Sequence, residues 1–195
     1  MSGAVQQDGR PQRADARRNR DLLLEAASAV FEERGVEAPL DEIARRAGVG
    51  IGTLYRHYPT RDAVVEAVYR REVELLCSGV DTLLAEHDPV TALRTWMRSF
   101  AVYVARKRGM ATALKAMVGV DSELFRESHE RIEAAITTLV RAATDAGAIR
   151  TDLEPMDLLR GMSGICMAND APDAGERTAR LVDLLIDGMR YGASS

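Results

Sequence analysis

Apolar residues recur three and four positions apart along most of this chain, which is the spacing of a helix that buries one face. The clearest stripe lies between residues 16 and 34 and consists of Leu23, Ala26, Ala27, Val30 and Phe31. Asp15 can cap this helix at its start, and Gly35 stands where a left-handed residue often ends one. No segment of alternating apolar and polar residues is long enough to predict a strand. The pattern therefore predicts an all-α fold.

Two short helices are predicted next, over residues 39–47 and 51–58, with Gly48-Val49-Gly50 between them. Thr60 can then cap a long helix predicted over residues 61–86. Glycine, proline and capping residues divide the remainder into five more helices, about nine in all. The five are predicted over residues 89–108, 109–119, 122–147, 155–168 and 173–191, the last opened by a capping box of Asp173 and Glu176.

Length and composition are those of an ordinary globular protein. A chain of 195 residues suits one large domain, or a small domain joined to a larger one. Hydrophobic residues make up 46% and charged residues 29%, which excludes global disorder, and no apolar stretch is long enough for a membrane span. We expect the polar residues 1–14 to be a disordered tail. Cys77 and Cys166 fit no disulfide or zinc pattern, which favours a reducing cytoplasm.

The two short helices and the helix before them match the pattern of a helix-turn-helix unit. In the second short helix Ile51, Leu54 and Tyr58 are three and four positions apart, so we expect them to pack inward. Gly50 and Gly52 have no side chain and let the backbone approach another surface closely. The outward positions then hold groups that can bond to phosphates or base edges, namely Thr53, Tyr55, Arg56 and His57.

The charge distribution supports a local nucleic-acid surface on a chain of net charge −4. Residues 43–61 contain four arginines, one histidine and no acidic residue, and residues 10–20 contain five arginines against Asp15. A DNA-binding protein needs phosphate contacts for affinity and a few aimed side chains for readout. Arg45 and Arg46 fit phosphate contacts, and they fit a solvent-exposed face equally well.

The stretch from Ala47 to Asp62 resembles the signature of the tetracycline-repressor (TetR) family of regulators. The similarity extends back through residues 40–44 to about Arg18. It implies a three-helix DNA-binding head on a larger helical body that binds ligand and forms a dimer. The chain departs from the family where Ala38-Pro39 replaces a capping threonine that touches phosphate, and where Gly50-Ile51 replaces a more usual polar pair.

Position by position, the resemblance implies DNA contacts from Thr53, Tyr55 and His57, with Gly52 as the point of closest approach. Arg61 stands where the family usually has a lysine that contacts phosphate. An arginine can serve there too, although its fork differs from the point charge of a lysine.

The last two predicted helices carry apolar stripes that are wide for surface helices. Such stripes fit an intramolecular core, and two neighbouring terminal helices of this kind also suit an isologous interface between subunits. The resemblance implies a homodimer built from these helices. The predicted interface residues are Leu158, Met162, Ile165, Leu181, Leu184, Leu185, Gly188 and Met189.

Large apolar side chains also gather at helical spacing in the middle of the chain. This spacing marks them as core residues first, but adaptable methionines beside aromatic rings also line ligand cavities. Arg98 is the only ionised side chain between Trp96 and Val104. We therefore expect the helices over residues 90–146 to enclose a cavity for a hydrophobic, weakly polar effector. Its predicted lining is Met97, Phe100, Tyr103, Leu114 and Met117.

Together these features favour a ligand-responsive transcriptional regulator in the cytoplasm. We expect residues 15–60 to bind double-stranded DNA and residues 61–195 to bind effector and dimerise, in a repressor that a small molecule releases from a palindromic operator. The alternatives are a DNA-binding regulator or architectural protein without an effector, and a helical enzyme that kept a head-like corner. No HExxH, GxSxG, GxxxxGK[ST] or SxxK motif is present, so we expect no catalytic residue, metal or cofactor.

Overall fold

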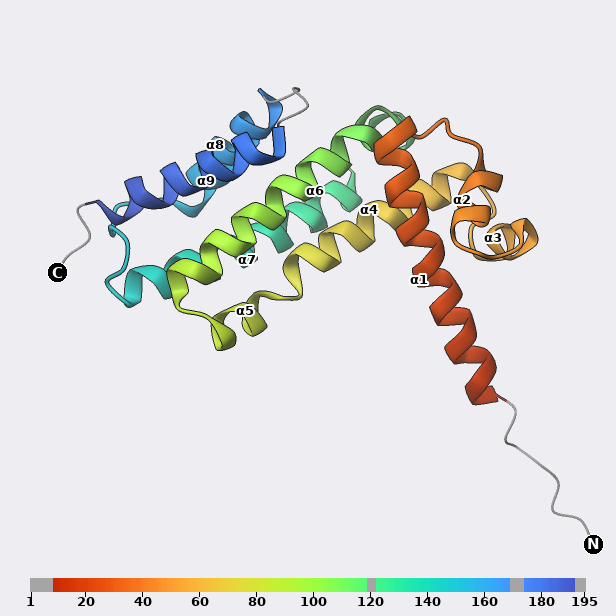
Figure 1. Cartoon of the computed structure of the whole chain (residues 1–195), viewed down its shortest axis with the longest axis horizontal. Helices are drawn as coiled ribbons and strands as arrows, with labels where there is room; N and C mark the ends of the chain where they lie inside the picture. The colour runs from red at the N-terminus through yellow and green to blue at the C-terminus, as the bar shows by residue number, and fades with distance from the viewer. Residues whose placement is uncertain (1–8, 119–121, 169–173, 192–195) are drawn as a thin grey trace, which may run out of the picture. The chain divides into compact units, whose positions relative to one another are not determined.

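The structure, a computed structural model, describes residues 9–118, 122–168 and 174–191 (Figure 1). Over these residues it contains nine α-helices and no strand, which confirms the predicted all-α fold class. The helices are α1 (Gly9–Arg34), α2 (Leu40–Arg46), α3 (Ile51–His57), α4 (Arg61–Cys77), α5 (Val80–Glu86), α6 (Pro89–Val118), α7 (Glu123–Asp145), α8 (Pro155–Met167) and α9 (Ala174–Arg190).

The helices fall into two compact units. The first, called the head below, comprises residues 1–71 and 109–117. The second, called the body, comprises residues 72–108 and 118–195. Helices α4 and α6 each contribute residues to both units. The domain boundary predicted at residue 60 stays a prediction.

Helix α1 begins at Gly9, earlier than the predicted start near Ala16. Residues 9–14 of the predicted disordered tail are therefore helical, while residues 1–8 lie outside the described residues. Pro11 does not prevent this, because it stands in the first turn, where backbone N–H groups have no partner within the helix. Glutamine, arginine and alanine, which follow it, are good helix formers.

The single helix predicted over residues 61–86 is in fact two helices, because α4 ends at Cys77 and α5 begins at Val80. Gly79 lies at the break, and glycine costs about 1 kcal/mol relative to alanine inside a helix. The break removes the helical N–H partner of the Leu76 carbonyl. The indole N–H of Trp96 donates to that carbonyl instead, at 2.9 Å. A side chain of α6 thus compensates for the end of α4.

The two helices predicted over residues 89–108 and 109–119 are one continuous helix, α6. Gly109, expected to separate them, lies inside it. A Cβ atom at this position would stand 2.9 Å from the carbonyl oxygen of Phe31, closer than Cβ atoms come in real structures. The glycine therefore permits close approach of α6 to the backbone of α1, and it does not end the helix.

A buried apolar cluster holds the first three helices of the head together. Helix α1 packs on α2, and α2 packs on α3. Phe31, Ile43 and Leu54, one from each helix, are almost completely excluded from solvent. Gly48 connects α2 to α3 with a φ of 68°, a left-handed conformation that glycine adopts at little cost. This core and this turn fix the direction in which α3 presents its side chains.

In the body, α7 packs against α5 and α8, and α8 packs against α9. Its core draws on α6, α7 and α9 and includes Leu93, Trp96, Ile136, Leu139, Val182 and Ile186. The Ser122 hydroxyl caps α7 by accepting a hydrogen bond from the Phe125 N–H at 3.4 Å. The capping box predicted for α9 needs Asp173, which lies outside the described residues. In the part of the chain that the structure describes, no helix is long and apolar enough to cross a membrane.

Candidate nucleic-acid interface

Two buried side chains anchor α3 in the head. Leu54 is completely buried, and Tyr58, which follows the helix, is 5% exposed. The Tyr58 hydroxyl accepts a hydrogen bond from Nε of Arg20 at 3.3 Å, which links the end of α3 to α1. Burial raises the pKa of Tyr58, so its phenol stays neutral at physiological pH. The opposite face of α3 is therefore the face offered to a partner.

That opposite face carries the side chains predicted to contact DNA. Tyr55 and Arg56 are exposed, and Thr53 and His57 are half-buried. Gly52 is also exposed, and a Cβ atom there would meet nothing within 4 Å. The structure thus brings these five residues together on one short helix. It offers hydroxyl, guanidinium and imidazole groups beside a backbone that another molecule can approach closely.

The exposed side chain of Arg56 lies back along its own helix. Its Nε donates to the Gly52 carbonyl at 3.2 Å, and its Nη2 donates to the Thr53 hydroxyl at 3.3 Å. A guanidinium has five N–H donors, so other N–H groups can still reach an anion. The contact also links Arg56 to the Thr53 hydroxyl, so two of the predicted DNA contacts are joined to each other on α3.

Ile51 does not pack inward as predicted, because 41% of its surface is exposed. The spacing argument placed it on the face of Leu54 and Tyr58. It lies at the edge of that face, about 40° around the helix axis from the exposed Tyr55. Val49, in the preceding turn, is the more buried of the two aliphatic residues. The outward face of α3 therefore contains an aliphatic side chain that sequence reasoning placed in the core.

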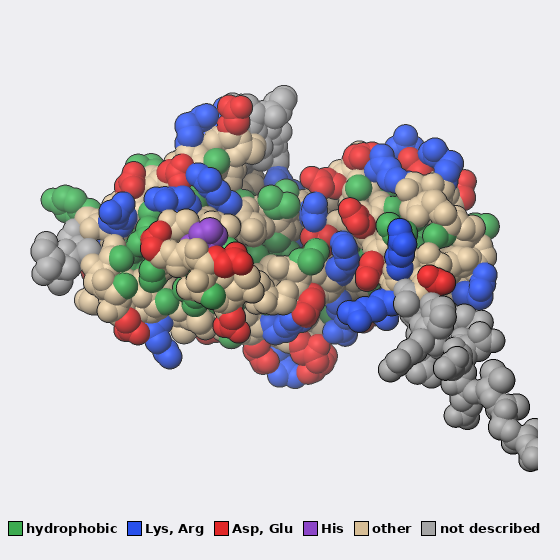
Figure 2. Space-filling view, turned by 60° about the horizontal axis from the view of Figure 1, so that its bottom comes forward, with side chains coloured by type: hydrophobic (Ala, Val, Ile, Leu, Met, Phe, Trp, Pro, Cys, Tyr) green, Lys and Arg blue, Asp and Glu red, His purple; other side chains and the backbone are tan. Residues whose placement is uncertain are grey.

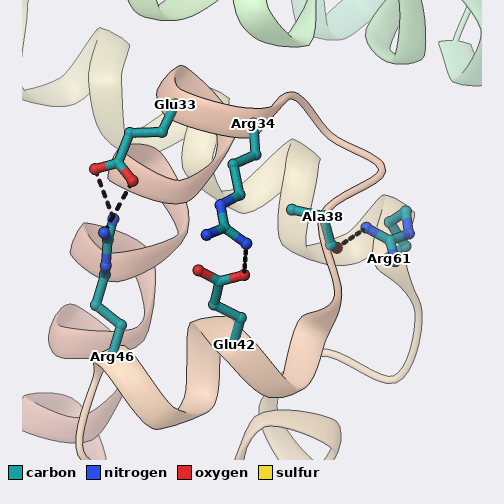
Figure 3. Close-up of polar contacts among 6 residues, drawn as sticks. All are labelled: Glu33, Arg34, Ala38, Glu42, Arg46 and Arg61. Atoms are coloured by element: carbon teal, nitrogen blue, oxygen red, sulfur yellow. Dashed lines mark hydrogen bonds and ion pairs between the residues drawn. The ribbon is translucent and has the colours of Figure 1, made fainter.

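Arg46, a predicted phosphate contact, pairs with an acidic residue of α1 (Figure 3). Its two terminal nitrogens donate to the two carboxylate oxygens of Glu33, each at 2.9 Å. This bond lowers the pKa of Glu33. A second pair, Arg34 with Glu42 at 2.7 Å, joins the same two helices. Both pairs hold α2 to the end of α1.

Arg61, also predicted to contact phosphate, points toward the connection between α1 and α2 (Figure 3). Its Nη1 donates to the carbonyl oxygens of Val36 and Ala38, the latter at 2.6 Å. These carbonyls lie in the connection between α1 and α2, so the first residue of α4 holds that connection in place. Sequence reasoning missed this role, because backbone acceptors leave no signal in the identity of the residues that carry them.

The predicted effector residues are divided between the two units. Met97, Phe100 and Tyr103 are buried in the body. The Phe100 ring lies 5.8 Å from that of Tyr103 and also stacks on Trp96. Leu114 is buried and Met117 half-buried in the segment of α6 that belongs to the head. The structure thus brings the first three together and leaves the other two in a separate unit.

A cation lies beside this aromatic group, and sequence reasoning did not single it out. Nζ of Lys107 is 5.8 Å from the centre of the Tyr103 ring and 5.6 Å from that of Phe125. Such distances are typical of cation–π contacts. The four-residue spacing of Tyr103 and Lys107 on one helix was the available signal.

The predicted dimer residues lie on α8 and α9 with different exposures. Leu158, Met162 and Met189 are buried within the body. Ile165, Leu181 and Leu185 are half-buried, and Gly188 is exposed. Leu184 is 66% exposed and Met167, which was not predicted, is 71% exposed. The apolar groups that these helices offer to another molecule are therefore Leu184 and Met167 above all.

Acidic and basic side chains are mixed over the face shown in Figure 2. This agrees with a positive surface that is local, since the whole chain carries a net charge of −4. Burial raises the pKa values of Cys77 and Cys166, which keeps both thiols protonated. Among the residues that the structure describes, no group of three His, Cys, Asp or Glu side chains is placed to hold a metal ion.

Two family models match the chain. The model of the tetR family of bacterial regulatory proteins matches residues 23–68, which contain α2 and α3. The model of the C-terminal domain of SbtR-like transcriptional regulators matches residues 88–191, more than half of the chain.

Two curated proteins are similar to this chain, one over most of its own length and one over about a third of it. The HTH-type transcriptional activator FasR of Mycolicibacterium smegmatis is 32% identical over 176 residues, which are 88% of this chain and 71% of that protein. An HTH-type transcriptional regulator of Staphylococcus aureus is 38% identical over 64 residues, which are 32% of this chain and 35% of that protein.

Solved structures extend the likeness to nearly the whole chain. A TetR transcriptional regulator from Streptomyces coelicolor matches with a TM-score of 0.82 at 47% identity, over 88% of this chain and 98% of that one. A TetR transcription regulatory protein from Mycobacterium vanbaalenii matches with a TM-score of 0.75 at 35% identity, over 92% of this chain and 99% of that one. A gamma-butyrolactone receptor, 20% identical with a TM-score of 0.62, shares the fold.

Proposed function

Because this chain belongs to the tetracycline-repressor (TetR) family of transcriptional regulators, we propose that it is a homodimeric repressor that a small effector releases from its operator. Each subunit places α3 in the major groove of one half of a palindromic site. The effector binds the body and favours a state of the dimer that fits the operator less well. It can do so only if it binds the two states with different affinities.

The observation that carries the proposal is the outward face of α3. Tyr55 and Arg56 are exposed there, Thr53 and His57 are half-buried, and Gly52 leaves the backbone open. These groups can donate hydrogen bonds to phosphate oxygens and base edges. The buried core of the head fixes the direction in which they point, so little ordering is needed when DNA binds.

Arg46 and Arg61 stay candidates for phosphate contacts, with a competing role for each. Arg46 already pairs with the carboxylate of Glu33, and Arg61 already donates to two carbonyls in the connection between α1 and α2. A phosphate would have to share or displace these partners. We therefore assign most of the affinity to α3 itself.

For the effector we retain a hydrophobic, weakly polar molecule bound in the body. The apolar group of Met97, Phe100 and Tyr103 supports this chemistry, and the aromatic rings offer broad apolar faces. A thermal-shift screen of hydrophobic compounds tests it. A true effector raises the melting temperature, by mass action, and lowers the affinity for DNA. Compounds that do only the first are ligands without a regulatory effect.

A transcriptional activator is the second candidate, because the relative FasR is described as an activator. A reporter gene placed downstream of the operator distinguishes a repressor from an activator. Deleting the regulator raises expression of the reporter if the protein represses and lowers it if the protein activates.

The DNA-binding proposal is tested with variants of α3. The purified protein first selects its preferred sequence from random DNA. We expect Tyr55→Phe and His57→Ala each to weaken binding to the selected site about tenfold, which corresponds to the loss of one good hydrogen bond. Fluorescence anisotropy at fixed salt measures this. Tyr191→Phe and His129→Ala make the same changes at exposed positions of the body and should leave the affinity unchanged.

Two results would contradict the proposal. The first is a failure of the protein to select any sequence. The second is an unchanged affinity in both α3 variants while their melting temperatures remain those of the unaltered protein, because the outward face of α3 would then not touch DNA.

A further inference from the structure

We propose that Ile51 is a specificity-determining residue of the head, which recognises a thymine through the thymine 5-methyl group. The inference rests on the proposed DNA-binding function. It goes beyond that function by naming one base and the chemical group through which it is read. In that function the polar side chains of α3 supply hydrogen bonds to DNA, whereas the side chain of Ile51 can make only an apolar contact.

The first step is the position of Ile51. The residue is 41% exposed, although isoleucine is among the residue types most often buried. It lies about 40° around the axis of α3 from Tyr55, so the two side chains stand one turn apart on the same face. Tyr55 is 49% exposed. An isoleucine that shares a face with a residue proposed to contact DNA lies where it can contact DNA as well.

The second step is the space around Ile51. Gly50 and Gly52 flank it, and a Cβ atom at either position would meet nothing within 4 Å. No neighbouring side chain in sequence therefore stands between Ile51 and an approaching surface. The aliphatic group projects from a stretch of bare backbone, which lets it enter a groove to a depth that larger neighbours would prevent.

The third step is the chemistry of the groove. Among the groups that base pairs present in the major groove, the 5-methyl of thymine is the apolar one, and the others are hydrogen-bond donors and acceptors. An isoleucine placed against a donor or acceptor would remove water from it without replacing the lost hydrogen bond. Against a thymine methyl it buries apolar surface on both partners. The contact therefore favours thymine over the other three bases at one position of each half-site.

The test uses DNA that lacks single methyl groups. In the site that the full-length protein selects, each thymine is replaced in turn by deoxyuridine, which keeps the base pairing and removes only the methyl. We expect one position per half-site at which this replacement weakens binding about fourfold, the effect of burying one methyl group. For Ile51→Ala, the same replacement at that position should have no effect.

Leu22→Ala serves as the matched control, because Leu22 is also an exposed aliphatic residue of the head, at 38%. It should keep the full sensitivity to the missing methyl. The melting temperature of each variant is measured alongside, so that a loss of fold is not mistaken for a loss of recognition. If Ile51→Ala melts early, Ile51→Val repeats the test with one methylene fewer, and the sensitivity to the missing methyl should then fall without disappearing.

The outcomes separate the inference from the function on which it rests. If the protein selects no sequence, both are overturned. If it selects a site and no thymine methyl affects binding, or if the variant at residue 51 remains as sensitive as the unaltered protein, only the role of Ile51 is overturned. A sensitivity to the missing methyl that is lost in Ile51→Ala and persists in Leu22→Ala supports the proposed role of Ile51.

Discussion

The missing side chain at Gly109 determines how closely two helices of the head approach each other. The carbonyl oxygen of Phe31 occupies the space that a Cβ atom at residue 109 would need, with only 2.9 Å between them. The obstacle is backbone of α1, which cannot rotate away as a flexible side chain would. Any other residue at this position must push α6 and α1 apart.

We therefore expect Gly109→Ala to destabilise the protein by about 1–2 kcal/mol. Overpacking typically costs about 1–3 kcal/mol, and the better helix propensity of alanine returns at most about 1 kcal/mol. Urea denaturation followed by circular dichroism measures the change. Gly175→Ala is the control, because a Cβ atom there meets nothing within 4 Å and should not destabilise α9. Equal stability of both variants would show that α6 can move away from α1 freely.

At the scale of elements, Arg61 links α4 to the connection between α1 and α2. The connection between α1 and α2 has no side-chain cap on α2, since Pro39 occupies the capping position. The guanidinium of Arg61 reaches back from α4 and binds two carbonyls of this connection. One cation therefore binds the connection at two points just before α2 begins.

We expect Arg61→Lys to lower the stability of the head while it preserves DNA binding. An ammonium group lacks the planar fork that reaches two acceptors, and loss of charged hydrogen bonds costs about 1.5–3 kcal/mol. Thermal denaturation measures the first effect and anisotropy the second. Arg160→Lys, at an exposed ion pair on α8, is the control and should change neither. If Arg61→Lys keeps the melting temperature of the unaltered protein, the contacts to Val36 and Ala38 do not contribute measurably to stability.

Sequence reasoning located most helices because periodic apolar positions and caps are local signals. Its predictions were wrong at two glycines, in opposite directions. One continuous helix was predicted through Gly79, although α4 ends beside it, and a helix end was predicted at Gly109, where α6 is continuous. Whether a glycine ends a helix depends on what lies next to it in space, and here Trp96 and Phe31 are far from these glycines in the chain.

Some features of the candidate site could likewise be predicted from the sequence, and others could not. The outward direction of Tyr55 and Arg56 follows from spacing within one helix, so the sequence was enough to predict it. Ile51 lies at the edge of the buried face, where spacing alone does not decide between core and solvent. The roles of Arg46 and Arg61 within the head depend on acceptors in other segments, which no periodic pattern reveals.

At the scale of the whole molecule, the exposed apolar side chains of α8 and α9 are the ones that the proposed dimer would cover. Leu184 and Met167 are more exposed than most apolar residues of a folded chain, at 66% and 71%. The residues beside them that are already buried, such as Met162, stabilise the body of one subunit. The interface of the proposed homodimer therefore rests on the exposed residues more than on the full predicted set.

We expect Leu184→Glu to produce a folded monomer. A charge at an exposed position leaves a single subunit intact, but buried between two subunits without a partner it costs several kcal/mol. Sedimentation velocity measures the mass, and circular dichroism confirms the fold. Leu75→Glu places the same charge at a leucine of α4 that is 55% exposed and should leave the dimer intact. A Leu184→Glu protein that stays dimeric would place the interface elsewhere.

The continuity of α6 through both units limits how the length of this chain can change over evolution. A loop takes up an added residue by bulging, whereas one residue added to a helix turns everything beyond it by about 100° and shifts it by about 1.5 Å. In α6 such an insertion before Met110 would rotate Met110 and Leu114, both buried, away from the apolar side. Insertions between compact units are usually tolerated, because a linker joins them. Here the border runs through the middle of α6, so an insertion there should be poorly tolerated.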